Sequence, residues 1–173
     1  TVACVHTLLR HTSVPVVIDA DGLNCLVEHL DVLRQCSVPV ILTPHPGEMA
    51  RLLGIDIATV QAHRLEIALD FAQRYGVYVV LKGAYTVLYA PDGQRWINPT
   101  GNPAMATAGT GDVLAGVIGA LLCQGLAPLQ AAQGGIYVHG LAGDRVRDRL
   151  GSHGLIASDL LEELPYAIQH IIK

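Results

Sequence analysis

The sequence has few charged residues and no long apolar run. Asp, Glu, Lys and Arg make up only 15% of the 173 residues, whereas 51% are hydrophobic. No run of Lys and Arg occurs, and a formal net charge of −4 provides no electrostatic attraction for nucleic acid or an acidic membrane surface. The longest apolar run, residues 113–123, is too short to span a bilayer and contains two glycines. We therefore expect no nucleic-acid or membrane partner, and strands buried on both faces.

The sequence also lacks the patterns of a disulfide framework, a cysteine metal site and a signal peptide. Its four cysteines, Cys4, Cys25, Cys36 and Cys123, are widely spaced in apolar segments. This spacing predicts reduced cysteines in the core of a cytoplasmic protein. Residues 1–9 have neither the basic region nor the small-residue cleavage site of a signal peptide.

Three short apolar runs rich in β-branched residues predict the strands. They are residues 14–20, 38–44 and 77–83, and each is nearly continuous rather than alternating, as in strands covered on both faces. Helical patterns at residues 22–36 and 59–76 separate them. The order β-α-β-α-β predicts an α/β fold with a mostly parallel sheet, right-handed crossovers and helices on both faces.

The pattern changes after the third run. The preceding helix has Thr59 as candidate N-cap and Gly76 as candidate C-cap. Residues 86–99 then predict a hairpin that turns at residues 91–93. Three helical stretches follow, at residues 110–124, 128–150 and 156–172. Because no linker or repeat divides the chain and it begins without Met on a helix leading into a strand, we expect residues 1–173 to be the C-terminal portion of a single domain.

Polar side chains follow each predicted strand. Asp19 and Asp21 come after the first, His45 and Glu48 after the second, and Lys82 after the third. In parallel sheets the carboxyl ends of the strands lie at one edge, and ligands bind there. We therefore expect these side chains to share one rim of the sheet.

Each of these residues also has a structural alternative. Asp21 is the better candidate for the N-cap of the next helix, whereas Asp19 could join Glu48 at a Mg²⁺ ion held largely through waters. Glu48 could instead begin a short helix, with His45 simply exposed. Lys82 could meet a nucleotide phosphate or be a solvated surface lysine.

The segment "AGTGD", residues 108–112, joins a loop of small residues to an apolar helix. It lacks the Lys-Ser/Thr of a Walker A loop, and its glycines do not match G-x-G-x-x-G. Gly109 and Gly111 permit positive φ and close backbone approach, and the following helix directs free N–H groups and its positive dipole end at the loop. The segment therefore predicts an anion hole formed by Ala108, Gly109, Thr110 and Gly111.

Asp112 is the only charged residue between Arg95 and Asp144, and it lies at the start of this helix. A first-turn carboxylate that only interacts with the helix dipole would contribute about 0.3–1 kcal/mol. A carboxylate beside an anion hole also suits phosphoryl transfer, in which it takes a proton from the attacking hydroxyl. The residues alone leave both roles open.

Four motifs together resemble the ADP/ATP-dependent NAD(P)H-hydrate dehydratases, a family with the ribokinase-like fold. They are "VIDADGLN", "LTPHPGEMARLLG", "VVLKGAYTVLYAPDG" and "NPTGNPAMATAGTGDVLAGVIGALLCQG", which occur in this order and cover most of the chain. The combination of "PHPGE" with "GNPAMATAGTGD" is quite specific, whereas "GTGD" alone marks the wider superfamily. Ala104 stands where the family often has glycine.

The resemblance implies a metabolite-repair enzyme, a carbon–oxygen lyase. Such an enzyme takes NADH or NADPH whose nicotinamide ring has been hydrated (NADHX or NADPHX). It phosphorylates the new hydroxyl with ADP or ATP in the presence of Mg²⁺. Phosphate then leaves, and the reduced cofactor is restored.

The resemblance also implies a set of site residues. Asp112 becomes the catalytic base and, with His45, contacts the hydrated dinucleotide. The backbone of residues 108–111 becomes the anion hole, and Glu48 and Asp19 become magnesium ligands. The implied adenylate-binding residues are Lys82, Gly83, Ala84, Tyr85, Thr86 and Gly111.

The family context adds further expectations. About a hundred residues of an ordinary family domain are missing before residue 1, and many relatives carry an N-terminal NAD(P)H-hydrate epimerase domain. A homo-oligomer and a cytoplasmic location are also expected. The alternatives are a small-molecule, vitamin-type kinase of the same fold and a non-catalytic nucleotide-binding module, and the sequence leaves ADP and ATP equally open as donors.

Overall fold

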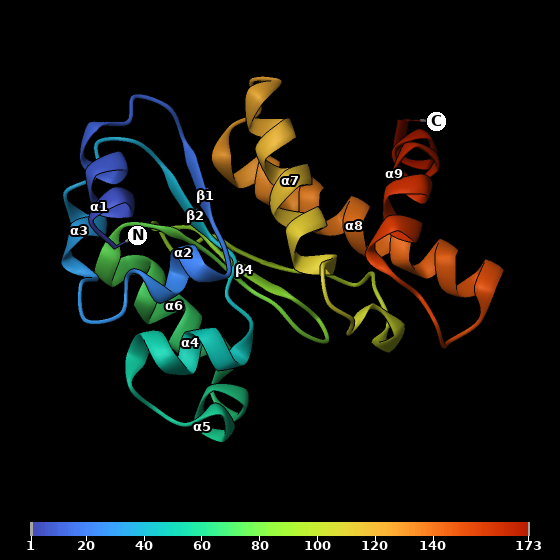
Figure 1. Ribbon diagram of the computed structural model, residues 1–173, viewed down its shortest axis with the longest axis horizontal. Coiled ribbons are helices and arrows are strands. Elements are labelled where there is room, and N and C mark those ends of the chain that lie inside the picture. The colour runs from blue at the N-terminus through green and yellow to red at the C-terminus, as the bar shows by residue number, and fades with distance from the viewer. Residues whose placement is uncertain (1, 173) are drawn as a thin grey trace. The chain divides into compact units, whose positions relative to one another are not determined.

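Three parallel strands followed by an antiparallel hairpin form the sheet of the computed structural model, which describes residues 2–172 (Figure 1). The parallel strands are β1 (Val16–Ile18), β2 (Val40–Leu42) and β3 (Tyr78–Leu81). The hairpin consists of β4 (Val87–Tyr89) and β5 (Arg95–Ile97), and β4 pairs antiparallel with β3. The strand order β1-β2-β3-β4-β5 confirms the three predicted strands and the hairpin.

The chain divides into two compact units, Thr1–Ile97 and Asn98–Lys173. The first contains the sheet and six helices among its described residues. These helices are α1 (Val2–His11), α2 (Asp21–Asn24), α3 (Asp31–Arg34), α4 (Pro46–Leu53), α5 (Ile57–Ala62) and α6 (Arg64–Tyr75).

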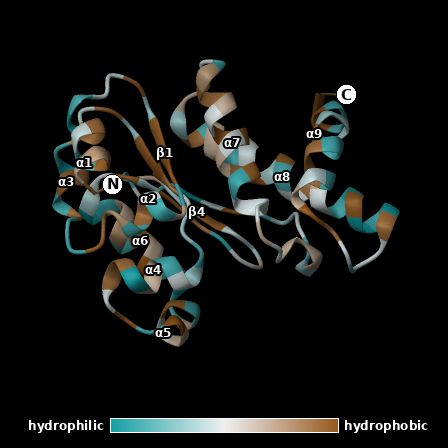
Figure 2. Ribbon diagram, viewed as in Figure 1, coloured by the Kyte–Doolittle hydropathy of each residue, from teal (hydrophilic) through white to brown (hydrophobic). Residues whose placement is uncertain are grey.

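Side chains on both faces of the central strands β2, β3 and β4 are buried, as the continuous apolar runs predict, whereas β5 is exposed. Val40, Leu42 and Val79 belong to the core that the sheet shares with the helices of the first unit. Ile41 and Val80, which alternate with them along the strands, are also fully buried. The strands accordingly carry hydrophobic residues almost without interruption (Figure 2).

The predicted helix at residues 22–36 is wrong, because it forms two short helices, α2 and α3. Turns with i→i−3 backbone bonds separate them, and Glu28 adopts a left-handed conformation with φ of 64°. The predicted N-cap Asp21 is also wrong, since Ala20 is the N-cap. Asp21 is the first helical residue, and its carboxylate accepts a bond from the Asn24 side chain at 3.0 Å.

The predicted helix at residues 59–76 begins earlier and is broken near its start. Asp56 is the N-cap of α5, and its carboxylate accepts bonds from both the backbone N–H (2.8 Å) and the hydroxyl (2.7 Å) of Thr59. Thr59 therefore lies inside the first turn rather than at the cap, which corrects its predicted role. The predicted C-cap is confirmed, because Gly76 ends α6 in the left-handed conformation with φ of 69°.

The second unit consists of a short 3₁₀ helix, η1 (Pro103–Met105), and three α-helices at the predicted positions. These are α7 (Thr110–Cys123), α8 (Pro128–Leu150) and α9 (Ala157–Ile172). Helix α8 packs against both α7 and α9, and its buried side chains Ala142 and Val146 share a core with Leu160. The long apolar stretch of the sequence thus forms a helix of this unit (Figure 2).

Two glycines of α8 allow the loop before α7 to approach this helix closely. A side chain at Gly140 would collide with Thr100, and one at Gly143 would collide with Met105. The small residues therefore determine where the loop that leads into α7 can lie.

The prediction of core cysteines is only half correct. Cys25 is buried and Cys36 partly so, whereas Cys4 and Cys123 are exposed, and all four are free thiols. Burial raises the pKa of the Cys36 thiol. Among residues 2–172, no helix combines the length and apolar character needed to cross a membrane.

Candidate functional site

The first unit brings together charged side chains from three strand ends. The Lys82 ammonium, after β3, lies 2.7 Å from a carboxylate oxygen of Asp19, after β1. It lies 3.7 Å from a carboxylate oxygen of Glu48, in the first turn of α4 after β2. The predicted meeting of these residues at one rim is confirmed.

The burial of this cluster rules out a simple solvated lysine. The Lys82 side chain is 18% exposed, and those of Asp19 and Glu48 are 10% and 9% exposed. Partly buried charges are stable only when they are paired, and here the two carboxylates pair with one ammonium.

A capping box at the start of α4 orients His45 and Glu48. The backbone N–H of His45 donates to the Glu48 carboxylate at 2.7 Å. In return, Nδ1 of the half-exposed His45 accepts from the backbone N–H groups of Gly47 (3.0 Å) and Glu48 (3.2 Å). An imidazole that accepts at Nδ1 carries its proton at Nε2 when neutral. Glu48 therefore lies in the first turn of α4, as the structural alternative to metal binding predicted. Its carboxylate also faces Lys82.

Hydrogen bonds fix the backbone of the segment of residues 82–86, mainly at its first residue, Lys82. The backbone N–H of Lys82 donates to the carbonyl of Pro44 at 2.8 Å. The guanidinium of Arg64, on α6, donates to the carbonyls of Leu81 (3.0 Å) and Lys82 (3.3 Å). The Thr86 hydroxyl donates to the Gly83 carbonyl at 3.0 Å. The segment is therefore preorganised by its own backbone and by Arg64.

Two residues of this segment have unusual backbone conformations. Gly83 has φ of 139°, and a side chain there would meet the Arg64 guanidinium. Tyr85 has φ of 53°, and 71% of it is exposed. A positive φ is uncommon outside glycine, and this exposed tyrosine lies three residues after Lys82 in the sequence.

Arg64 is a functional candidate that sequence reasoning missed. It lies within the predicted helix of residues 59–76, where an arginine is unremarkable, and its carbonyl partners are 17 and 18 residues away. Burial lowers the pKa of its guanidinium, which nevertheless stays charged at neutral pH.

The second unit positions the predicted anion hole and Asp112. Gly109 is the N-cap of α7, with φ of 86°. The Thr110 hydroxyl lies within hydrogen-bonding distance of the carbonyls of Met105 (3.0 Å) and Thr107 (2.9 Å), so the loop closes on the helix start. Asp112 is exposed in the first turn and makes no side-chain cap bond. Its carboxylate thus lies beside free helix N–H groups without serving as the cap.

Helix α8 supplies two further contacts that the sequence did not reveal. Nε2 of His139 donates to the carbonyl of Thr110 at 2.8 Å. The Asp144 carboxylate accepts from the backbone N–H of Gly101 and from the side-chain amide of Asn102, both at 2.9 Å. These residues tie the loop of residues 100–110 to α8.

Asp19 and Glu48 are the predicted magnesium ligands. In the described part of the chain, no group of three or more His, Cys, Asp or Glu side chains could hold a metal ion. The carboxylates of Asp19 and Glu48 nevertheless converge on one cation, the Lys82 ammonium. Mg²⁺ is commonly bound by one or two carboxylates together with waters and substrate phosphates. The donor chemistry of this pair therefore fits an ion that is completed by a phosphate.

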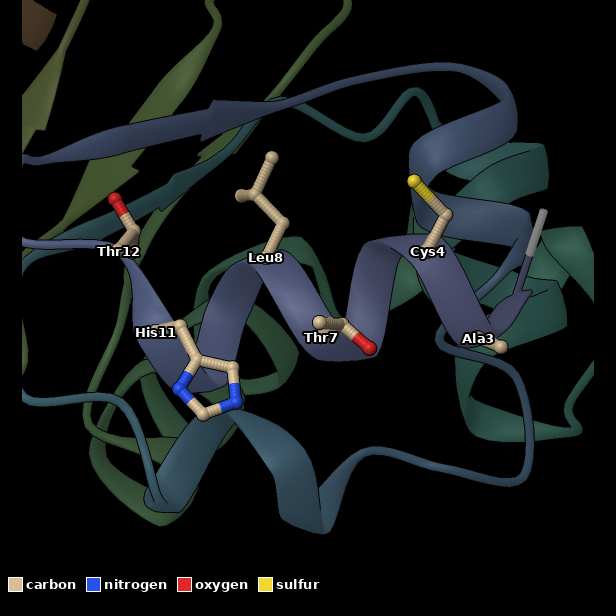
Figure 3. A pocket seen from close by; sticks show the side chains of 6 residues that line it. All are labelled: Ala3, Cys4, Thr7, Leu8, His11 and Thr12. Atoms are coloured by element: carbon tan, nitrogen blue, oxygen red, sulfur yellow. The ribbon is translucent and has the colours of Figure 1, made fainter.

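A hollow on the outer side of α1 contains none of the predicted site residues (Figure 3). Its lining consists of Ala3, Cys4, Thr7, Leu8, His11 and Thr12. The predicted site residues of the first unit thus lie at the strand ends and not in this hollow.

Comparison with known proteins agrees with these motifs. The family model of the NAD(P)H-hydrate dehydratases matches residues 2–166. The bifunctional NAD(P)H-hydrate repair enzyme of Moorella thermoacetica is 52% identical over 171 residues, which are 99% of this chain and 32% of that protein. The ADP-dependent (S)-NAD(P)H-hydrate dehydratase of Neisseria meningitidis is 45% identical over 96% of this chain and 57% of its own length.

Solved structures share the fold. The ADP/ATP-dependent NAD(P)H-hydrate dehydratase of Bacillus subtilis, co-crystallised with ATP and Mg²⁺, superposes with a TM-score of 0.83 at 39% identity, covering 90% of this chain and 55% of that one. A ribokinase-like protein of Enterococcus faecalis gives a TM-score of 0.76 at 26% identity over 98% of this chain and 58% of that one. The chain spans about a third to just over half the length of the relatives that it matches. By its sequence and its ribokinase-like fold, the chain belongs to the NAD(P)H-hydrate dehydratase family.

Proposed function

We propose that the chain carries the catalytic and nucleotide-binding part of a nucleotide-dependent (S)-NAD(P)H-hydrate dehydratase. The observation that carries this proposal is Asp112, an exposed carboxylate beside the free N–H groups at the start of α7. Family membership and the names of the relatives support it. The substrates are hydrated NADH or NADPH, with ADP or ATP as phosphoryl donor.

Asp112 acts as the general base in this proposal. It takes the proton of the ring hydroxyl while the hydroxyl oxygen forms a bond to the terminal phosphorus of the nucleotide. The bond from this phosphorus to its bridging oxygen breaks, which releases AMP from ADP or ADP from ATP. The backbone N–H groups of residues 108–111 and the helix dipole hold the negatively charged phosphoryl group. The ring then loses phosphate, a much better leaving group than hydroxide, together with a proton from the neighbouring ring carbon, and the nicotinamide double bond is restored.

The first unit binds the nucleotide and the metal in this proposal. Lys82 and the segment of residues 83–86 contact the adenylate part, and the exposed ring of Tyr85 offers it an apolar surface. His45 contacts the hydrated dinucleotide through its half-exposed imidazole. Asp19 and Glu48 would hold Mg²⁺, which would supply positive charge to neutralise the phosphate oxygens.

The remaining expectations complete the proposal. The two units form the C-terminal portion of one ribokinase-like domain, and the protein is a cytoplasmic homo-oligomer. Because several relatives are bifunctional repair enzymes, we also propose an epimerase domain in the same protein. Light scattering after size-exclusion chromatography would measure the oligomeric state.

An absorbance assay tests the proposed activity. The chain is mixed with hydrated NADPH, Mg²⁺ and either ADP or ATP, with the Bacillus subtilis dehydratase as positive control, and the reduced-nicotinamide band is followed. A nucleotide-dependent rise identifies the activity and the donor. No rise from this chain or from the full-length protein that contains it, under conditions where the control is active, would contradict the proposal. A rise from the full-length protein alone would mean that part of the active site lies outside residues 1–173.

Product analysis separates the alternatives. A vitamin-type kinase would accumulate a stable phosphorylated product, and a non-catalytic module would bind nucleotide without consuming it. Phosphate released in equal amount to the NADPH formed would exclude both.

A further inference from the structure

Lys82 occupies the position in the first unit where a metal ion would meet both acidic side chains. Its ammonium lies 2.7 Å from Asp19 and 3.7 Å from Glu48. Two carboxylates and one ammonium leave a single net negative charge, in surroundings where all three side chains are at least four-fifths buried. The cluster is therefore largely neutralised without a metal.

The backbone around the cluster keeps these groups in place. The N–H of Lys82 is bonded to Pro44, and its carbonyl is bonded to Arg64. The Glu48 carboxylate is held by the backbone N–H of His45. The Glu48 carboxylate thus has a defined position, whereas the four-carbon stem of Lys82 permits its ammonium to move.

A divalent ion and the ammonium would repel each other if both lay between the same two carboxylates. At the short distances found here, like charges in partly buried surroundings repel each other much more strongly than they would in water. The ion can therefore bind only when the ammonium moves away or finds another anion. A nucleotide phosphate is such an anion.

We propose that Lys82 is an internal counter-ion that excludes divalent metal from Asp19 and Glu48 in the free protein and releases them when its ammonium pairs with the phosphate of a bound adenylate. Metal and nucleotide then bind in a coupled manner, each favouring the other by the same factor. The second half of this inference rests on the proposed nucleotide-binding function, whereas the first half concerns the free protein alone.

Direct metal binding to the free protein tests the first half. Mn²⁺ is titrated without nucleotide into the wild type and into Lys82→Met, and free Mn²⁺ is followed by electron paramagnetic resonance. Lys82→Met is expected to bind Mn²⁺ at least about tenfold more tightly, because the competing charge is gone. Arg95→Met, which removes one exposed positive charge from β5, is expected to bind like the wild type.

Two further variants assign the binding to the cluster. Lys82→Met combined with Asp19→Asn, or with Glu48→Gln, is expected to lose the gained affinity. Because Lys82→Met leaves two buried carboxylates without a counter-ion, Mn²⁺ is also expected to raise its melting temperature more than that of the wild type. Lys82→Gln provides the same comparison if the methionine variant does not fold.

Mn²⁺ titration in the presence of AMP tests the second half of the proposal, the coupling of metal binding to nucleotide binding. AMP is used because its single phosphate chelates the metal less than the two phosphates of ADP do. Saturating AMP is expected to tighten Mn²⁺ binding to the wild type and to leave Lys82→Met unchanged. The proposal is overturned if a folded Lys82 variant binds Mn²⁺ no more tightly than the wild type, or if the gain survives the loss of either carboxylate. Because turnover is not measured, failure of the dehydratase assay would not alter this result.

Discussion

At the scale of single residues, replacing Asp112 tests whether this carboxylate is a catalytic base or only stabilises the start of its helix. It makes no cap bond and is exposed, so its replacement should not disturb α7. Asp112→Asn is expected to keep the fold and nucleotide binding but to lower kcat by about 10²–10⁴-fold, the usual contribution of a general base. Absorbance kinetics and ADP calorimetry would measure the two effects.

Asp159 offers a matched control for this variant. It is also a first-turn carboxylate of the second unit, at the start of α9. Asp159→Asn should leave turnover unchanged. Normal turnover in Asp112→Asn would show that Asp112 is not the base.

Arg64 is expected to act indirectly, by holding the backbone of the nucleotide-binding segment of residues 82–86 in place. Its guanidinium bonds to the carbonyls of Leu81 and Lys82, and bonds to charged groups are worth roughly 1.5–3 kcal/mol. Arg64→Met should loosen the segment of residues 82–86 and weaken ADP binding roughly tenfold or more, since 1.4 kcal/mol is a factor of ten. Calorimetry with ADP would measure this, with the exposed Arg74→Met as control. Equal affinity in the two variants would rule out the positioning role.

At the scale of elements, an acidic residue of α9 joins this helix to α8. Glu163 is buried, and its carboxylate accepts from Arg145 at 2.9 Å and from Arg149 at 3.1 Å. Glu163→Gln should destabilise the protein by about 1–3 kcal/mol, because the partly exposed arginines lose a charged partner while water screens part of the effect.

Urea unfolding would measure this loss. The neighbouring Glu162 is exposed, so Glu162→Gln is the matched control and should stay within about 0.5 kcal/mol of the wild type. If both variants unfold alike, the pairing of α8 with α9 through Glu163 does not stabilise the fold.

The stability that the N-cap of α5 contributes should depend on pH. Hydrogen bonds from the Thr59 side chain and backbone lower the pKa of Asp56 below its ordinary value of 3.8. A group with a lowered folded pKa stabilises the fold above its unfolded pKa, and this contribution disappears as the pH falls through the folded pKa.

Asp56→Ala should therefore be less stable than the wild type at pH 7, and the difference should shrink as the pH falls below 3.8. Thermal unfolding at a series of pH values would measure it. Asp70→Ala, which removes an exposed carboxylate within α6, is the control. A difference that is independent of pH would mean that the Asp56 charge does not stabilise the cap.

At the scale of the whole molecule, charge balance should control solubility. The isoelectric point is about 6.0, and the surface exposes large apolar side chains such as Leu8, Val14 and Leu161. Proteins associate most readily where their net charge is near zero. Solubility is expected to be lowest near pH 6 and to rise on either side, which turbidity measurements would show. A flat profile would mean that these apolar groups do not drive association.

Local sequence patterns determined the elements and the family of this protein. The apolar runs of the strands, the hairpin turn and Gly76 depend on neighbours a few residues apart, which is why they could be predicted. The same patterns failed at residues 22–36 and at Thr59. Helical periodicity there does not reveal that Glu28 adopts a left-handed conformation, which interrupts the helix, or that the Asp56 carboxylate is the N-cap.

Only the tertiary structure decided how the site residues are paired. Lys82 meets Asp19 across 63 positions of sequence, and Asp144 holds a loop about 42 positions away. Such contacts arise because parallel strand ends share one edge and because small residues of α8 admit the loop. The sequence predicted which side chains carry charge at the rim, and folding determined that the cation between the two carboxylates is a lysine.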